Sequence, residues 1–95
     1  MRLKLSVRAE RDIHELVRFG YSQYGFQYTE EYTRQLRQRI AQLREFPLIG
    51  VPRSDVRPGI RLLIFKAHNI PYLVLDDEVE VVRVLHRSAN WADLV

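Results

Sequence analysis

Several residue types are scarce in this 95-residue chain, and each scarcity excludes a class of protein or site. No cysteine is present, which excludes a disulfide framework and a cysteine-based metal site and fits a reducing compartment. The four glycines are scattered at expected turns, so there is no glycine-rich phosphate-binding loop. The N-terminal stretch MRLKLSVRAERD has no long apolar run, so we expect no signal peptide and no membrane span. The expected location is the cytoplasm.

Lysine is also scarce. It occurs only at Lys4 and Lys66, so arginine supplies most of the positive charge, and the formal net charge is +3. This balance permits an acidic partner or nucleic acid but does not select either. Apolar residues (46%) and charged residues (28%) are abundant enough to indicate a folded chain rather than a disordered one. The length predicts a single domain spanning residues 1–95.

The N-terminal segment predicts a short strand followed by a helix. Residues 2–6 alternate apolar and basic side chains, as a strand with one buried face does. Ser6 is a suitable N-cap for the helix that follows. From Ala9 onward the apolar residues recur at helical spacing, and Gly25 is expected to end this helix.

A second helix is expected after a short link at 25–28. Thr29 is its predicted N-cap, and Pro47 is expected to end it near Phe46. One stripe of apolar residues runs along it: Tyr32, Leu36, Ile40 and Leu43. The two helices should form a helical hairpin.

The C-terminal half predicts strands. Residues 47–59 contain three prolines and two glycines and are expected to form a loop. Three apolar runs at hairpin spacing follow, at 60–67, 70–75 and 79–86, and predict an antiparallel meander. The element order is therefore β-α-α-β-β-β. The predicted fold class is α+β, with a helical hairpin packed on one face of an antiparallel sheet.

The predicted strands are apolar on both faces, although two helices can cover only one. The second face would carry exposed apolar side chains with two arginines among them, and such a surface usually binds a partner. The alternative is that the tail at 88–95 folds back over it. The residues assigned to this target or partner surface are Leu62, Ile64, Leu73, Leu75, Arg83, Leu85, Arg87 and Trp91.

The sequence contains no metal-binding pattern. His14, His68 and His86 belong to different predicted elements and have no metal-ligand spacing. His14 is interpreted as a structural residue on the first helix and His68 as a solvated turn residue. The acidic run at 76–78 is interpreted as a solvated hairpin turn, because adjacent turn carboxylates point apart. We expect neither a metal ion nor a cofactor.

One set of residues could act on RNA. Metal-free cleavage needs a base for the 2′-hydroxyl, cations for the phosphate and an acid for the 5′-oxygen. Arg61 and Arg87 could stabilise phosphate charge, and His86 could be the base or the acid. Trp91 could stack on a base but cannot transfer a proton at neutral pH. The set thus holds one acid–base group, and the alternative is that His86 and Trp91 only pack the end of the sheet.

The chain resembles the RelE/ParE superfamily of bacterial toxins from type II toxin–antitoxin systems. The resemblance covers essentially the whole chain. It is carried by the element order and by two stretches, LREFPLIGVPRSDVRPGIR at 43–61 and YLVLDDEVEVVRVLHR at 72–87. It implies the fold predicted above and a small cognate antitoxin as partner.

The two branches of the superfamily imply different activities. RelE-like members cleave messenger RNA on the ribosome with strand-borne arginines and a later tyrosine. Arg87 matches one arginine, but Ile70 stands at the position aligned with the other, and no tyrosine follows Tyr72. If the chain were such a ribonuclease, its catalytic residues would be Arg61, His86 and Arg87.

ParE-like members inhibit DNA gyrase without a known nuclease site. Their last strand commonly ends in VLH and soon reaches a tryptophan, as Val84–His86 and Trp91 do here, although RSAN replaces the usual charged residues. The resemblance therefore favours the ParE-like branch, for which no catalytic residues are expected. The implied partners are a ParD-like antitoxin and DNA gyrase, with operator DNA bound only through the antitoxin complex and no membrane. A homodimer that buries the apolar face remains an open alternative.

Overall fold

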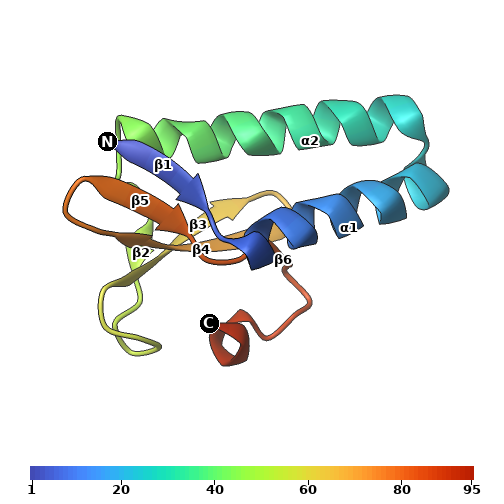
Figure 1. Ribbon diagram of the computed structural model, residues 1–95. Coiled ribbons are helices and arrows are strands. Elements are labelled where there is room, and N and C mark those ends of the chain that lie inside the picture. The colour runs from blue at the N-terminus through green and yellow to red at the C-terminus, as the bar shows by residue number, and fades with distance from the viewer.

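The computed structural model describes all residues, 1–95, as a helical hairpin above a sheet with a short C-terminal helix below it (Figure 1). The helical elements are α1 (Val7–Tyr24), α2 (Phe26–Ala41) and two 3₁₀ turns, η1 (Gln42–Arg44) and η2 (Trp91–Leu94). The strands are β1 (Arg2–Leu5), β2 (Val51–Pro52), β3 (Ile60–Phe65), β4 (His68–Val74), β5 (Glu78–Val81) and β6 (Leu85–His86). The predicted α+β class is confirmed, and β2 lies within the segment expected to be a loop.

Local side-chain chemistry determines where α1 begins and ends. Ser6 is the N-cap, and its Oγ accepts a hydrogen bond from the backbone N–H of Ala9 at 2.9 Å. Gly25 has a φ of 86°, a left-handed conformation that favours glycine, and it ends the helix. Both predictions are confirmed.

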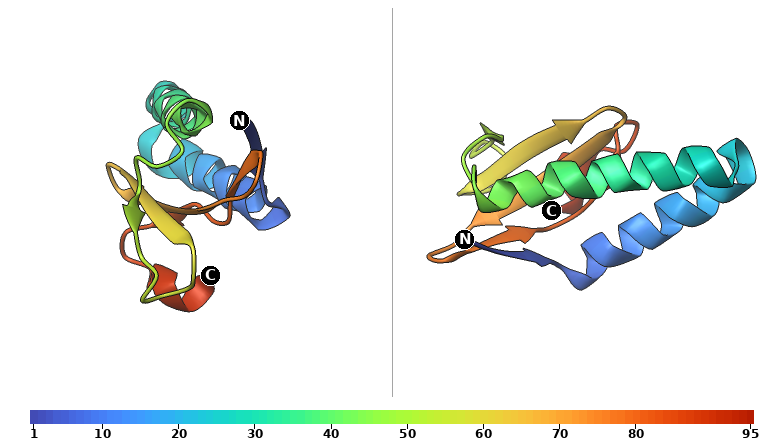
Figure 2. Two further views of the ribbon diagram at one scale, coloured as in Figure 1. Left: turned by 90° about the vertical axis from the view of Figure 1, so that its left-hand side faces the viewer. Right: turned by 90° about the horizontal axis from the view of Figure 1, so that it is seen from above.

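Gly25 alone links the two helices. The predicted cap at Thr29 is wrong, because α2 already begins at Phe26 and Thr29 is buried inside it. Thr29 packs closely against α1, since a Cβ added to Gly20 would lie 2.5 Å from the Thr29 Oγ1. The hairpin projects past the sheet at the end that carries this link (Figure 2).

The sheet is mixed rather than purely antiparallel. Its order is β1-β5-β4-β3-β2, with β6 paired to β4 beyond this path. The predicted antiparallel meander is present, but β1 lies parallel to β5. This register places Leu3 opposite Val79 and Leu5 opposite Val81, so the leucines of β1 join the core under the helices.

The strand predicted at 79–86 is interrupted. Residues 82–84 belong to no strand: the N–H of Val82 still donates to the backbone oxygen of Pro71, but the N–H of Val84 donates to the side chain of Asp12 on α1 at 2.9 Å. The turn before β4 also lies two residues earlier than predicted, because residues 68 and 69 were expected to form it. It consists of Lys66 and Ala67, with Lys66 at a φ of 49°, so His68 opens the strand.

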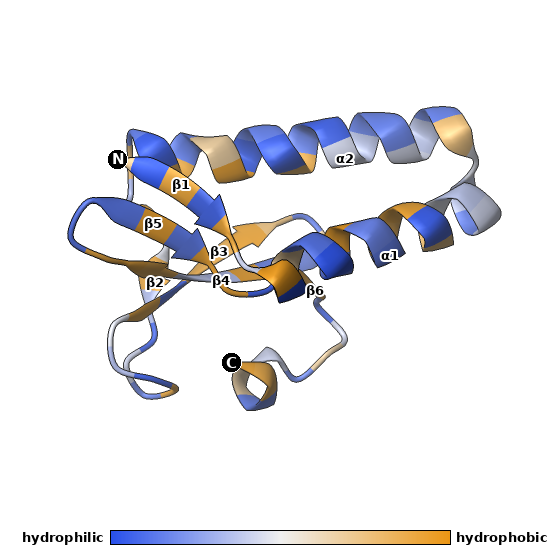
Figure 3. Ribbon diagram, viewed as in Figure 1, coloured by the Kyte–Doolittle hydropathy of each residue, from blue (hydrophilic) through white to orange (hydrophobic).

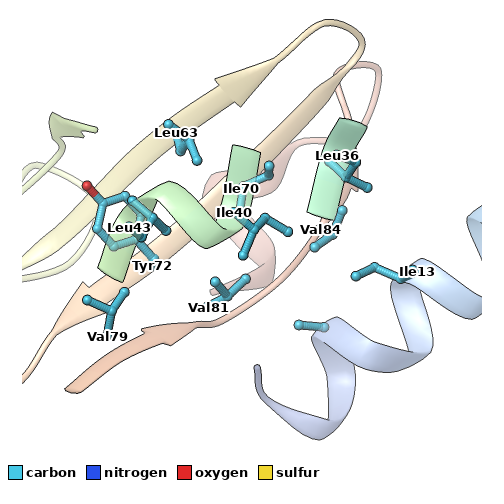
Figure 4. Packing of buried hydrophobic residues seen from close by; sticks show 11 residues of the cluster. Ile13, Leu36, Ile40, Leu43, Leu63, Ile70, Tyr72, Val79, Val81 and Val84 are labelled. Carbon is cyan, nitrogen blue, oxygen red and sulfur yellow. The ribbon is translucent and has the colours of Figure 1, made fainter. Parts of the chain in front are cut away.

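The main core lies between the helices and the upper face of the sheet (Figure 4). The predicted apolar stripe is confirmed for Leu36 and Ile40 of α2 and for Leu43 of η1, which are buried, whereas Tyr32 is only half-buried. Most of α2 is hydrophilic, whereas β3 and β4 are largely hydrophobic (Figure 3). The helix therefore turns its apolar stripe toward the sheet and its hydrophilic side toward solvent. None of the helices combines the length and the apolar character needed to cross a lipid bilayer.

Candidate functional site

The C-terminal tail covers the centre of the second sheet face. Trp91 of η2 packs with Ile60, Leu62 and Leu85 in a second buried cluster. This cluster is surrounded by further residues of the tail, Ala89, Ala92 and Val95. In this part of the face the tail therefore folds back over the sheet, which was the alternative to an exposed partner surface. The Arg53 guanidinium lies over the Trp91 ring, 5.3 Å from its centre, and shields it further.

The other residues of the predicted partner surface differ in burial and in the face of the sheet on which they lie. Leu73 is half-buried against the second cluster, whereas Ile64 and Leu75 are 58% and 46% exposed. Arg83 does not lie on this face, because its guanidinium forms two hydrogen bonds to the Asp12 carboxylate of α1, at 2.8 and 3.0 Å. The predicted surface is therefore not one continuous apolar patch.

The predicted ribonuclease residues are also separated. Arg61 donates hydrogen bonds to the backbone oxygens of Leu48 and Gly50 and lies opposite Tyr72 in the β3–β4 register. His68 opens β4 four register positions away, which corresponds to about 13 Å along a strand. Arg61 thus lies at the other end of the strand pair from His86 and Arg87.

The fold brings together two histidines, His68 and His86, that belong to different predicted elements. His68 and His86 are register partners of β4 and β6, and their rings are perpendicular with centres 5.6 Å apart. We call them the histidine pair. The Nδ1 of His68 shares a 2.7 Å hydrogen bond with the Tyr32 hydroxyl, and the Nδ1 of His86 lies 2.8 Å from the Ser88 Oγ. The interpretation of His68 as a solvated turn residue is wrong.

Burial controls the charge of this corner. Desolvation, and to a smaller extent the electrostatic influence of the neighbouring His86, lower the pKa of His68 to about 4, so the His68 imidazole is neutral at pH 7. Burial also raises the pKa of the Tyr32 hydroxyl, while the charge of Arg87 acts to lower it. The corner therefore combines a neutral imidazole, a neutral phenol and a nearby guanidinium.

An open groove runs from the histidine pair along the helical hairpin. Its volume is about 740 Å³, and we call it the hairpin groove. His68, His86 and Ser88 lie among its lining residues, together with Asp12 and Glu15 of α1. Most of the lining is apolar or aromatic: Leu16, Phe19, Tyr24, Tyr28, Tyr32, Ala67, Val84 and Leu85.

The groove contains a row of aromatic rings. Tyr24, Tyr28, Tyr32, His68 and His86 follow one another with ring centres 5.4 to 6.3 Å apart. The row is accessible at the hairpin end, where Tyr24 and Tyr28 are 63% and 59% exposed. Exposed aromatic side chains on a concave apolar surface are typical of a site that binds another protein.

Comparison with known proteins now identifies the family. The family model described as "ParE toxin of type II toxin-antitoxin system, parDE" matches residues 3–91. The chain belongs to the ParE toxin family. The predicted ParE-like branch of the superfamily is thereby confirmed.

Two curated ParE proteins and one solved structure illustrate the relationship. Toxin ParE1 of Caulobacter vibrioides is 32% identical over 87 residues, which cover 92% of this chain and 90% of that protein. Toxin ParE1 of Mycobacterium tuberculosis is 33% identical over 90 residues, covering 94% and 92%. The solved structure "Chromosomal ParDE TA system from P. aeruginosa" has a TM-score of 0.81 at 19% identity, over 90% of this chain and 95% of that one, and shows the same fold.

The ParE family assignment does not by itself locate the groove, and only part of the groove has a recognisable sequence pattern. Tyr28 and Tyr32 are four residues apart and therefore lie on one side of a helix, which could have indicated an aromatic stripe. The histidine pair had no such signal, because it depends on the two-residue turn before β4 and on the break at 82–84.

Proposed function

We propose that this ParE-family chain inhibits DNA gyrase in the bacterial cytoplasm and is neutralised by a ParD-like antitoxin that occupies the hairpin groove. The hairpin groove carries this proposal, because it is a concave apolar surface that no segment of the chain covers. The family name and the ParDE title of the solved structure support an antitoxin as the partner. Operator DNA would be bound only through the antitoxin complex.

An amphipathic helix of the antitoxin fits the groove best. The apolar walls from α1 and α2 can receive side chains repeating at helical spacing, and Tyr28 and Tyr32 offer flat contact surfaces. Arg87 and Lys66 lie near Tyr32, so an acidic side chain on the antitoxin would find cations at the sheet end of the groove.

Removing exposed groove aromatics should weaken antitoxin binding. We expect Phe19→Ala combined with Tyr28→Ala to reduce affinity at least tenfold, because both side chains are 59% exposed in the free chain and would be buried by the antitoxin helix. Isothermal titration with the cognate antitoxin measures this effect. The matched control is Phe46→Ala, since Phe46 is 57% exposed but does not line the groove. Equal weakening by the control, or none by the double variant, would contradict the assignment.

Gyrase inhibition requires contacts rather than bond-making side chains. We expect His86→Ala with Arg87→Ala to lose at most about 1–3 kcal/mol of binding free energy, so that excess protein restores inhibition. The measurement is supercoiling by purified gyrase across a titration of wild-type and variant protein. His14→Ala with Arg18→Ala, two exposed residues on α1, is the control for loss of positive charge. Wild-type protein without effect on gyrase at any concentration would refute the proposal.

The histidine pair favours a ribosome-dependent ribonuclease as a second candidate. Two adjacent imidazoles with Arg87 nearby could supply a base, an acid and a phosphate-stabilising cation. In that case the same double variant should lose at least about a hundredfold in cleavage while ribosome binding is kept. An assay of ribosome-bound messenger RNA run beside the supercoiling assay distinguishes the two. Cleavage that vanishes in the variant, with gyrase unaffected by either protein, would establish the second candidate.

A further inference from the structure

The positive charge of the chain is concentrated at one end. Of its 15 arginines and lysines, five lie within residues 39–61, against two of its 12 carboxylates, so this segment carries the whole formal net charge of +3 and the rest of the chain is neutral. The segment runs from the last turn of α2 through η1 and β2 to the start of β3. It lies at the end of the molecule opposite the link between the helices, and that end faces the viewer in the left panel of Figure 2. We call it the basic end.

The basic end also exposes apolar side chains. Phe46, Leu48, Ile49 and Val51 are between 40% and 63% exposed. They are four of the six residues at 46–51, so they form one run on the surface rather than isolated exposed positions. None of them lines the hairpin groove. An exposed apolar patch with basic residues around it is typical of a surface that binds another protein.

Hydrogen bonds from the sheet hold this apolar run in place. The Tyr72 hydroxyl donates to the backbone oxygen of Pro47 at 2.7 Å and accepts the N–H of Gly50 at 2.8 Å. Arg61 donates to the backbone oxygens of Leu48 and Gly50, at 3.1 and 2.8 Å. These bonds turn polar groups of the backbone toward the sheet, while the side chain of Leu48 lies outside. Side chains on a loop that is already fixed lose less conformational entropy when a partner covers them.

We propose that the basic end is the surface through which the chain binds its target, and that it fits an acidic protein surface with an apolar hollow. This inference rests on the proposed function, in which the target is DNA gyrase. Arg44 and Arg57 supply the charge contacts, because both are exposed and their guanidinium groups have no partner within the chain. Arg53, by contrast, is already paired with Asp55.

The composition of the basic end favours a protein partner other than the antitoxin. Its cations are all arginines, the basic residue that is enriched at protein interfaces, where lysine is depleted. A protein can bury the exposed aliphatic side chains, whereas a phosphate backbone offers them little, so DNA alone is a poorer match. The antitoxin is assigned to the hairpin groove, whose lining includes no residue of the basic end. The concentrated positive charge would also attract an acidic partner and speed its association.

The test is supercoiling by purified gyrase across a titration of wild-type and variant protein. Leu48→Ser with Ile49→Ser should raise the half-inhibiting concentration about tenfold or more, because the apolar contacts at the centre of the surface are lost. Arg44→Gln with Arg57→Gln should raise it several-fold at low salt and by less at high salt, because salt screens exposed charges. All four residues are exposed, so both variants should keep the thermal midpoint of the wild type.

Matched controls remove the same kinds of side chain elsewhere. Val7→Ser with Phe26→Ser replaces two exposed apolar residues, and Arg8→Gln with Arg11→Gln replaces two exposed arginines of α1. Neither control should change the half-inhibiting concentration. Isothermal titration with the cognate antitoxin should give the wild-type affinity for both variants of the basic end, because the hairpin groove is intact in them.

Several results would overturn the proposal. Inhibition of gyrase at wild-type strength by both variants of the basic end would refute this surface and leave gyrase as the target. An equal loss in the controls, or a loss of antitoxin affinity in place of gyrase inhibition, would refute it as well. Fluorescence anisotropy with duplex DNA alone tests the other occupant, and DNA binding that falls by the same factor in the variants would replace the protein partner by DNA. A wild-type chain inert toward gyrase would refute the proposed target and this surface together.

Discussion

Leu36→Asp is expected to leave the chain unable to fold. Leu36 is fully buried midway along α2, and Ile40 is buried one turn further on (Figure 4). A carboxylate placed there has no cation to pair with, and burying it costs several kcal/mol, which is about the whole stability of a domain of this size. Ile40→Asp should have the same effect. Circular dichroism during heating checks this, and the variant should show no cooperative transition.

A substitution on the outer face of the same helix provides the control. Gln38 is exposed, so Gln38→Asp introduces the same carboxylate without burying it, and we expect a native spectrum and a thermal midpoint close to that of the wild type. A cooperatively melting Leu36→Asp chain would show that α2 does not present this stripe to the core.

Asp12→Ala is expected to lower the free energy of unfolding by about 3 kcal/mol, because removing one partner of a largely buried ion pair leaves the other charge uncompensated. The side chains of Asp12 and Arg83 are only 15% and 11% exposed. Asp12 also accepts the N–H of Val84, so its loss leaves a second polar group without a partner. Urea denaturation measures the change.

Two further variants test the cause of this loss. Asp12→Leu with Arg83→Met replaces the pair by apolar side chains and should be less destabilising than Asp12→Ala, because no unpaired charge remains. Asp77→Ala removes the partner of Arg2 in an ion pair whose side chains are 75% and 74% exposed, and it should have little effect. A loss from Asp12→Ala as small as that from Asp77→Ala would mean that the pair does not hold the backbone at 82–84.

The elements predictable from the sequence were those decided by neighbouring residues. Ser6 and Gly25 act on backbone groups within one helical turn, and the spacing of Leu36 and Ile40 records which face of α2 is buried. Thr29 was misread because a threonine before two glutamates has the chemistry of an N-cap. The small Gly20 opposite it instead allowed the two helices to approach closely.

The site depends on contacts between residues that are far apart in the sequence, and the periodicity of apolar residues does not predict such contacts. The strand pattern at 79–86 does not indicate that the carboxylate of Asp12, 72 positions earlier, accepts a hydrogen bond from the N–H of Val84 and interrupts the strand. That interruption gives β6 its own pairing with β4 and places His86 opposite His68. The tail was likewise underestimated, because one tryptophan at position 91 covers the centre of a sheet face once it is folded back.

The parallel pairing of β1 with β5 has a consequence for synthesis of the chain. The side chain of Arg2 donates a hydrogen bond to Asp77, 75 positions further along. The first strand that the ribosome makes, β1, therefore cannot pair until β5 has been synthesised. Until residues 78–81 have emerged, β1 has no neighbouring strand and the helical hairpin has only part of its sheet to pack against, and such non-local pairings form late. A nascent chain interrupted before β5 cannot close the sheet, so a prematurely terminated message yields no folded toxin.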